Sequence, residues 1–267
     1  MWPLFIFVVS CHVALATAQA PDLLVFQGDT LLLFANPLES HPDREQIHRQ
    51  LPAQWKACWS TACWRGYQAV WLLENDHLYL IEIRSCCSSG DHRKADLNAL
   101  FGRQVVSHRV LGDWVTNTLL CPIGKLLYYV HEDYLSVYEQ ELSFTVNAGR
   151  LLNLTRYDNR RTIVSPLLEN ARELSHFLCR QTNWQTLGAA LKSGEVRKVV
   201  IAVDPYSLGR PAHIEVLKAD GDLFTSEALR LIKLIPIWTA VYRRGRYAPN
   251  RYMVPVVFSK EKRESCR

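Results

Sequence analysis

The chain has 267 residues, a formal net charge of +5, 48% apolar residues and 21% charged residues. This composition excludes global disorder and supplies a buried core for one large domain or two small ones. The positive charge is modest and follows no long basic stripe, which excludes a typical nucleic-acid-binding protein.

The N-terminal segment, residues 1–18, reads MWPLFIFVVSCHVALATA and is almost wholly apolar. An apolar stretch that ends in an Ala-x-Ala site is typical of a secretory signal peptide. We expect cleavage after Ala18, because cleavage after Ala20 would leave Pro21 first, and proline has a fixed φ and no N–H. The expected location is therefore the periplasm. Two alternatives stay open: an uncleaved membrane anchor, and lipidation at Cys11 with attachment to the outer membrane.

Export affects the interpretation of the cysteines. Eight are present, and without Cys11 the remaining ones are Cys58, Cys63, Cys86, Cys87, Cys121, Cys179 and Cys266. An oxidising compartment favours disulfides over metal ligation. We predict that Cys58 pairs with Cys63, because the short stretch between them can turn back on itself. A zinc site made from Cys58, Cys63, Cys86, Cys87 and His92 is the less favoured interpretation. We expect no metal and no cofactor.

Residues 22–150 show the alternation of apolar and polar side chains that is typical of strands. Three hairpins are predicted: Leu23–Phe26 with Leu31–Phe34, Gln68–Leu73 with Leu78–Ile83, and Leu126–Val130 with Val137–Val146. One short helix is predicted at Lys94–Phe101. The many aromatic residues are assigned to the core rather than to a ligand-stacking face. We predict an α+β protein whose N-terminal domain is β-rich, either a sandwich or a partly open barrel.

Residues 151–182 are expected to form a helical connector. Pro166 opens a predicted helix in which Leu167, Ala171, Leu174 and Leu178 share one face. Residues 260–267 are expected to be a charged tail.

Residues 183–259 are predicted to be a second, smaller α+β domain. Strands are expected at Val196–Val203, Ala212–Leu217 and Tyr252–Phe258. The helix between the last two strands is expected to have Asp222 as its N-cap, with Phe224, Ala228, Leu231 and Ile235 on one face. Pro236 ends this helix, and Trp238 is expected to lock the helix to the sheet.

The order of these features resembles the TonB C-terminal domain family. The residues that carry the resemblance are Val200–Asp204, Ile214–Leu217, Ser226–Lys233, Pro236, Trp238, Gly245 and Val254–Phe258. The resemblance implies a mixed sheet of βαββ or ββαβ order with a helix on one face. It also implies that the last strand pairs with a segment of an outer-membrane receptor during TonB-dependent transport. This role maps onto Tyr252, Met253, Val254, Pro255, Val256, Val257 and Phe258. The N-terminal half resembles uncharacterised secreted bacterial proteins through Cys63–Tyr67 and Gly124–His131.

No catalytic motif is present: there is no His-Glu-x-x-His, no Gly-x-Ser-x-Gly and no phosphate-binding loop. We therefore expect a protein that is not an enzyme and that binds an envelope protein or peptide by strand addition, with self-association left open. Pro255 has no N–H, so its strand is expected at a sheet edge or a bulge. Such an edge fits a site for a partner and a protected edge equally well. The alternatives are an envelope hydrolase and a cell-wall-binding protein.

Overall fold

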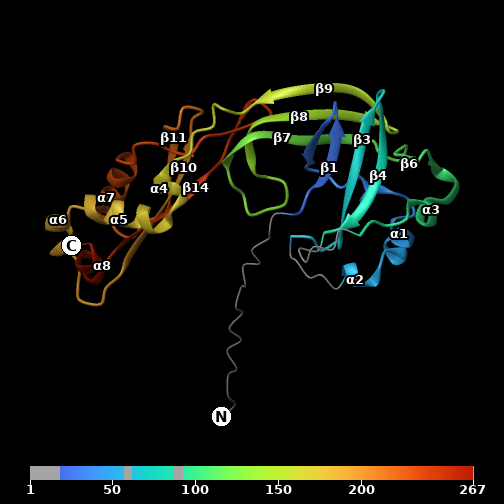
Figure 1. Cartoon of the computed structure of the whole chain (residues 1–267). Helices are drawn as coiled ribbons and strands as arrows, with labels where there is room; N and C mark the ends of the chain where they lie inside the picture. The colour runs from blue at the N-terminus through green and yellow to red at the C-terminus, as the bar shows by residue number, and fades with distance from the viewer. Residues whose placement is uncertain (1–18, 57–61, 87–92, 267) are drawn as a thin grey trace, which may run out of the picture. The chain divides into compact units, whose positions relative to one another are not determined.

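The computed structural model describes residues 19–56, 62–86 and 93–266. The predicted signal peptide lies outside these ranges, as do Cys58, Cys87 and His92. The described residues form an α+β fold, as the sequence predicts (Figure 1). None of their helices is long and apolar enough to cross a membrane.

The chain divides into two compact units. Unit 1 contains the residues up to Pro122 together with Tyr129–Ser136 and Leu142–Thr155. Unit 2 contains Arg156–Arg267 together with Ile123–Tyr128 and Val137–Glu141. The division therefore runs through strands of the large sheet, and the boundary expected between residues 150 and 151 is not a clean one.

Unit 1 is built on one large sheet with the strand order β2-β1-β3-β4-β9-β8-β7, and the short hairpin β5–β6 pairs with β4. Its strands are β1 (Asp22–Phe26), β2 (Asp29–Leu33), β3 (Tyr67–Glu74), β4 (His77–Ser85), β5 (Val105–Val106), β6 (Arg109–Leu111), β7 (Asn117–Tyr128), β8 (Val137–Asn147) and β9 (Arg150–Asp158). Its helices are α1 (Arg44–Gln50), α2 (Ala53–Lys56) and α3 (Leu97–Phe101). The third of these confirms the predicted helix, which begins later than expected because Asp96 caps it.

The sheet of unit 1 curls toward a barrel without closing. Just after β2, Phe34 N donates to Leu120 O of β7 over 2.7 Å, so the two edge strands meet. The Phe26 ring on β1 lies 5.1 Å from the Phe144 ring on β8, although three strands separate β1 from β8 in the sheet. Strands that are not neighbours touch only when the sheet curves, so of the two predicted architectures, a sandwich and a partly open barrel, the curved sheet is closer to the second.

The predicted hairpins are confirmed as β1–β2, β3–β4 and β7–β8. The tight turns Gln27-Gly28 and Asn75-Asp76 place both residues at positive φ, which suits the right-handed twist of the flanking strands. A similar turn at Ala148-Gly149 leads directly into β9. The first part of the expected connector is therefore wrong, because residues 151–158 form a strand. Most side chains of β9 are exposed, so its sequence lacks the apolar alternation that marks a strand.

The aromatic residues of unit 1 fill its core, as predicted. Trp55, Tyr67 and Trp71 are at most 1% exposed. Trp114 stacks on Phe101 and meets the edge of His41. Trp64 and Tyr129 are exceptions, with 68% and 44% of their surfaces exposed.

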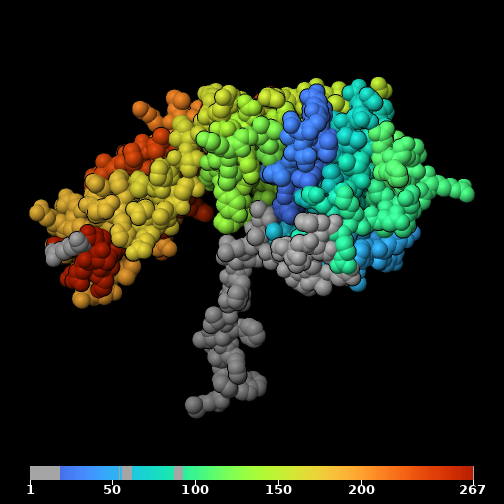
Figure 2. Space-filling model, in the orientation of Figure 1, coloured from blue at the N-terminus to red at the C-terminus, as the bar shows by residue number. Residues whose placement is uncertain are grey.

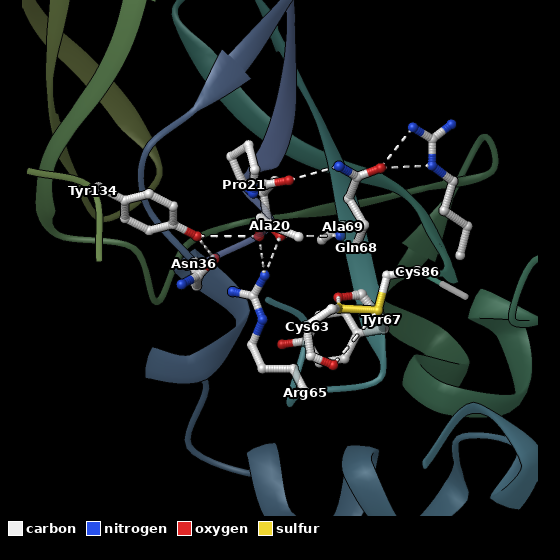
Figure 3. Close-up of a disulfide and its surroundings, with 12 residues drawn as sticks. Ala20, Pro21, Asn36, Cys63, Arg65, Tyr67, Gln68, Ala69, Cys86 and Tyr134 are labelled. Atoms are coloured by element: carbon white, nitrogen blue, oxygen red, sulfur yellow. Dashed lines mark hydrogen bonds and ion pairs between the residues drawn. A yellow bond between two sulfur atoms is a disulfide. The ribbon is translucent and has the colours of Figure 1, made fainter. Parts of the chain in front are cut away.

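A buried ion pair anchors the start of β1 (Figure 3). Asp22 is fully buried and accepts hydrogen bonds from Trp71 Nε1 and from Ala69 N, each over 3.2 Å. Arg65 Nη2 lies 3.5 Å from the Asp22 carboxylate and donates to Ala20 O over 2.8 Å. Burial raises the pKa of Asp22 to about 6, against the opposing effects of Arg65 and the two hydrogen bonds. The carboxylate therefore depends on the guanidinium to remain charged in the core.

A disulfide in unit 1 joins Cys63 to Cys86, so the predicted Cys58–Cys63 pair is wrong (Figure 3). Cys63 precedes β3 and Cys86 follows β4. The antiparallel register of these strands, with Tyr67 opposite Ser85, brings the two cysteines together. Because both sulfurs are bonded, they are not available to the alternative zinc site.

Removal of this disulfide by Cys63→Ala/Cys86→Ala is expected to destabilise the protein by about 3 kcal/mol, the loop-closure entropy of a loop of this size. The two cysteines are 23 residues apart. Urea unfolding of the double variant measures the effect. The matched control is Cys121→Ala, which removes a buried thiol that takes part in no disulfide. An unchanged unfolding midpoint for the double variant would show that the bond does not constrain the chain.

Unit 2 contains a three-stranded sheet with the order β11-β10-β14 and a separate hairpin, β12–β13. Its strands are β10 (Arg197–Pro205), β11 (Pro211–Lys218), β12 (Val241–Arg243), β13 (Arg246–Ala248) and β14 (Tyr252–Phe258). Its helices are α4 (Pro166–Glu169), α5 (Ala171–Gln181), α6 (Trp184–Gly188), α7 (Asp222–Lys233) and α8 (Lys260–Ser265). β10, β11, α7 and β14 give the expected ββαβ order. Both pairings of the sheet are antiparallel, whereas the resemblance implies a mixed sheet.

Three details of unit 2 differ from the sequence predictions. The single predicted helix after Pro166 is divided, because Asn170 leaves the helical conformation and caps α5 with its side chain. Asp222 is the first residue of α7 rather than its N-cap, which is Gly221. The expected tail forms α8, whose Lys262 N–H is capped by the Ser259 side chain.

Candidate functional site

Strand β14, Tyr252–Phe258, lies at an edge of its sheet. β10 pairs with it on one side, and no strand of the described part of the chain pairs with it on the other. Its sequence, YMVPVVF, carries no charge. Val254, Val256 and Phe258 are buried and pack into a core with residues of β10, α5 and α7. The opposite set, Met253, Pro255 and Val257, faces away from this core, and Met253 is 71% exposed.

The outward-facing backbone groups of β14 follow from its register with β10. Pro255 pairs with Val200 and has no N–H to donate, which suits a pair without hydrogen bonds. Two residues along, Lys198 pairs with Val257, yet Lys198 N donates to Asp220 Oδ2 over 2.8 Å and therefore points away from β14. Since the two kinds of pair alternate, Met253, Pro255 and Val257 direct their backbone groups away from β10. The free edge thus offers two donors and three acceptors.

The other edge of the sheet, β11, is less suited to a partner strand. Its pairing with β10 is irregular at two places, between Val200 and Ile201 and between Asp204 and Pro205. It carries the exposed residues His213, Glu215 and Lys218. Irregular pairing and charged side chains are devices that protect an edge from further pairing. β14 has neither, so it is the better candidate for strand addition.

A groove of about 240 Å³ runs along the free edge of β14. Three consecutive residues of the strand, Pro255, Val256 and Val257, form one wall, which shows that the groove follows the backbone edge. One face of α5 forms the other wall, and Lys262 of α8 completes the groove. We call this hollow the α5–β14 groove; its other lining residues are Ala171, Leu174, Ser175, Leu178 and Cys179 of α5, and Thr182, the C-cap of that helix.

The walls of the α5–β14 groove are fixed to each other. A disulfide joins Cys179 of α5 to Cys266, at the end of α8. In Figure 2 the yellow-orange surface of α5 lies against the dark red surface of α8. Leu178 is buried in the same core cluster as Val254 and Val256 of β14. The disulfide and the shared core therefore connect the two walls of the groove within unit 2.

Trp238 positions the beginning of β14, and Pro236 lies exposed in the segment before it. Trp238 is fully buried, and its ring lies 5.7 Å from the ring of Tyr252. Trp238 N donates to Gly209 O over 2.8 Å. Gly209 has φ +68°, and a Cβ there would lie 2.7 Å from Trp238 O, so glycine is required at this contact. Pro236 follows the end of α7, as predicted, and Trp238 locks the helix to the sheet.

Burial shifts the pKa values of two side chains near the free edge of β14, Tyr252 and Lys262. Desolvation raises the pKa of Tyr252 above its ordinary value, so the phenol stays neutral. Desolvation lowers the pKa of Lys262, because the ammonium is partly removed from water. The Tyr252 hydroxyl donates to Thr239 O over 3.5 Å.

The alternative of a hydrolase rests on unit 1, where Glu39, His48 and Tyr67 form a small network. Tyr67 donates to Glu39 over 2.5 Å, and His48 Nε2 lies 3.1 Å from the same oxygen. Burial raises the pKa of Glu39, but the hydrogen bonds with His48 and Tyr67 outweigh this effect and hold the pKa below its ordinary value. Glu39 also lines a polar hollow of about 440 Å³. An ionised Glu39 is not a general acid, and among the described residues no hydroxyl or thiol nucleophile is bonded to His48.

The sequence identified β14 but not the α5–β14 groove. Tyr252–Phe258, Trp238 and Pro236 all belong to one region, whereas Cys63 lies in unit 1 and Cys58 lies outside the described residues. The apolar stripe of α5 was the only sequence signal for the second wall. Comparison with known proteins found no matching family model, no similar curated protein and no similar solved structure.

Proposed function

We propose that the protein is an exported, non-enzymatic binding protein of a bacterial envelope. In this proposal unit 2 takes up an extended segment of another envelope protein as a fourth strand beside β14, in the manner of the TonB C-terminal domain family. A role in TonB-dependent transport across the outer membrane belongs to the same proposal. The disulfides Cys63–Cys86 and Cys179–Cys266 fit an oxidising compartment.

The observation that carries the proposal is the difference between the two edges of the sheet. β14 is regular, uncharged and unpaired on its outer side, while β11 is irregular and charged. Main-chain hydrogen bonds supply the affinity in strand addition, and alternate side chains supply the specificity. At β14, the helix-facing side chains of an added strand would enter the α5–β14 groove.

Replacement of Val257 with proline tests the proposal. Short random peptides displayed on phage are selected on the purified protein, and synthetic copies are titrated against each variant. Val257→Pro removes an outward N–H and places a ring where the partner must approach, so we expect peptide affinity to fall about tenfold or more. The fold should be retained, because this N–H serves no pair within the sheet.

Val256→Pro is the matched control. Its N–H faces β10 in the register described above, so this substitution should clearly destabilise unit 2 in urea unfolding, whereas Val257→Pro should not. Equal peptide binding by wild type and Val257→Pro would overturn the proposal, as would the failure to select any peptide. A larger loss of stability for Val257→Pro than for Val256→Pro would show that the free edge is oriented the other way.

A further inference from the structure

The α5–β14 groove combines apolar walls with one cationic residue. Leu174, Leu178, Val256 and Val257 line it together with small side chains, and Lys262 is the one ionisable residue among its lining residues. The hydroxyl of Thr182 already donates to Leu178 O over 2.8 Å. Apart from Lys262 and Ser175, the groove is therefore lined by apolar side chains and by side chains that are already bonded.

The backbone of Lys262 is held in position by both ends of α8. Its backbone N–H donates to Ser259 Oγ over 3.1 Å at the start of the helix, and the disulfide between Cys266 and Cys179 fixes the other end to α5. Lys262 lines the groove, and desolvation of its ammonium shows that the side chain is partly removed from water.

The ammonium of Lys262 has no carboxylate partner among the described residues. The ion pairs of unit 2 involve Arg160, Arg197, Arg230 and Arg251. Glu261, the acidic residue next to Lys262, accepts from Gly194 N instead. Partial burial without a counter-charge is unfavourable for an ammonium, and the lowered pKa of Lys262 reflects it.

Unit 2 as a whole is positively charged, like Lys262. Unit 2 contains 21 of the 31 lysine and arginine residues and 13 of the 26 aspartate and glutamate residues, so its formal net charge is +8. A positive potential of this kind raises the association rate of a negatively charged partner. Charge complementarity therefore favours an acidic occupant for the groove.

A ligand in the α5–β14 groove must also be complementary to the backbone of β14. One wall of the groove is the free edge of β14, whose outward N–H and C=O groups are complementary to an extended peptide and not to a lipid or a glycan chain. We propose that the α5–β14 groove selects an extended, largely apolar peptide segment that carries an acidic side chain, and that this carboxylate pairs with Lys262. The inference rests on the proposed strand addition and adds the chemical class of the partner segment.

Parallel selections test this inference. Random phage-displayed peptides are selected on wild type, on Lys262→Gln and on Lys233→Gln. Lys233 is an exposed residue near the end of α7 and is absent from the groove lining, so its substitution makes the same change in net charge elsewhere. We expect aspartate or glutamate at one fixed position of the peptides selected on wild type and on Lys233→Gln, and no such preference on Lys262→Gln.

Titration of matched synthetic peptides, with glutamate or glutamine at that position, completes the test. A charge-assisted hydrogen bond contributes about 1.5–3 kcal/mol, so the glutamate peptide should lose about tenfold or more in affinity on Lys262→Gln. The glutamine peptide should bind both forms alike. Equal acidic preference with and without Lys262, or the same loss with Lys233→Gln, would overturn the inference.

The outcomes separate this inference from the proposed function. If peptides depend on Val257 but show no acidic preference, strand addition stands and the role of Lys262 falls. If binding depends on Lys262 but not on Val257, the ligand is an anion held by charge alone, and both the strand addition and the peptide class are wrong.

Discussion

Replacement of Trp238 with alanine is expected to lower the stability of unit 2 by about 3–5 kcal/mol, the usual cost of deleting a buried aromatic side chain. Trp238 is fully buried, contacts the Tyr252 ring at the start of β14 and lies in one core cluster with residues of α5, α7 and the sheet. A cavity at this point would loosen the beginning of the candidate binding strand as well as the core.

Urea unfolding measures the effect, and Trp64→Ala is the matched control. Trp64 is 68% exposed, so the same substitution there should change stability little. Trp238→Phe should be milder than Trp238→Ala, because it keeps most of the apolar volume and the buried Nε1 of Trp238 has no hydrogen-bond partner to lose. Equal losses for Trp238→Ala and Trp64→Ala would contradict the role assigned to Trp238.

Replacement of Arg65 with leucine is expected to destabilise unit 1 by about 3–5 kcal/mol near pH 8, because it leaves a buried carboxylate without its counter-charge. Asp22 is fully buried, and the Arg65 side chain is 1% exposed. The guanidinium also supports Ala20 O, so the N-terminal segment before β1 would lose a contact at the same time.

The loss should depend on pH in a defined direction. The pKa of Asp22 in the folded protein is raised to about 6 from its ordinary value of 3.8, so the folded state binds this proton more tightly than the unfolded state. The carboxylate therefore costs nothing below the unfolded pKa, and stability falls as the pH rises through the folded pKa. Without Arg65 the folded pKa rises further, which extends this loss to higher pH.

Urea unfolding of wild type and Arg65→Leu at about pH 5 and about pH 8 measures the difference. The destabilisation should be smaller at the lower pH, where Asp22 carries a proton in the variant. The double variant Asp22→Asn/Arg65→Leu should recover part of the stability at the higher pH, because no buried charge remains. A destabilisation that grows toward low pH would contradict this account.

The sequence predicted the elements that combine strong periodicity with clear turn chemistry. Asn75-Asp76 lies between two alternating apolar runs, and both the turn and the strands β3 and β4 are observed. The turns at Ser107-His108 and Arg244-Gly245 have the same backbone conformation but were not predicted as hairpins. Their strands are only two or three residues long, too short for a period to show in the sequence.

Contacts between residues far apart in the sequence were the other features that could not be predicted. Cys63 pairs with Cys86 because a hairpin brings their positions together, and no local spacing reveals that partner. α8 has an almost wholly charged sequence, yet it is helical because Ser259 caps it and Cys266 ties it to α5. The candidate site shows the same division. The missing N–H of Pro255 predicted an edge strand, while the groove beside it depends on α5, which lies far away in the sequence.

The long strands β7 and β8 supply residues to both units. A fragment that begins at Arg156 would therefore lack the two short segments, Ile123–Tyr128 and Val137–Glu141, that complete unit 2. Unit 2 is therefore not one linear segment of the chain, and any exchange of this unit between proteins has to carry parts of β7 and β8 with it. The two units also share a constraint on sequence change. Because β7 and β8 supply residues to both units, an insertion or deletion in these strands would shift the strand register in both.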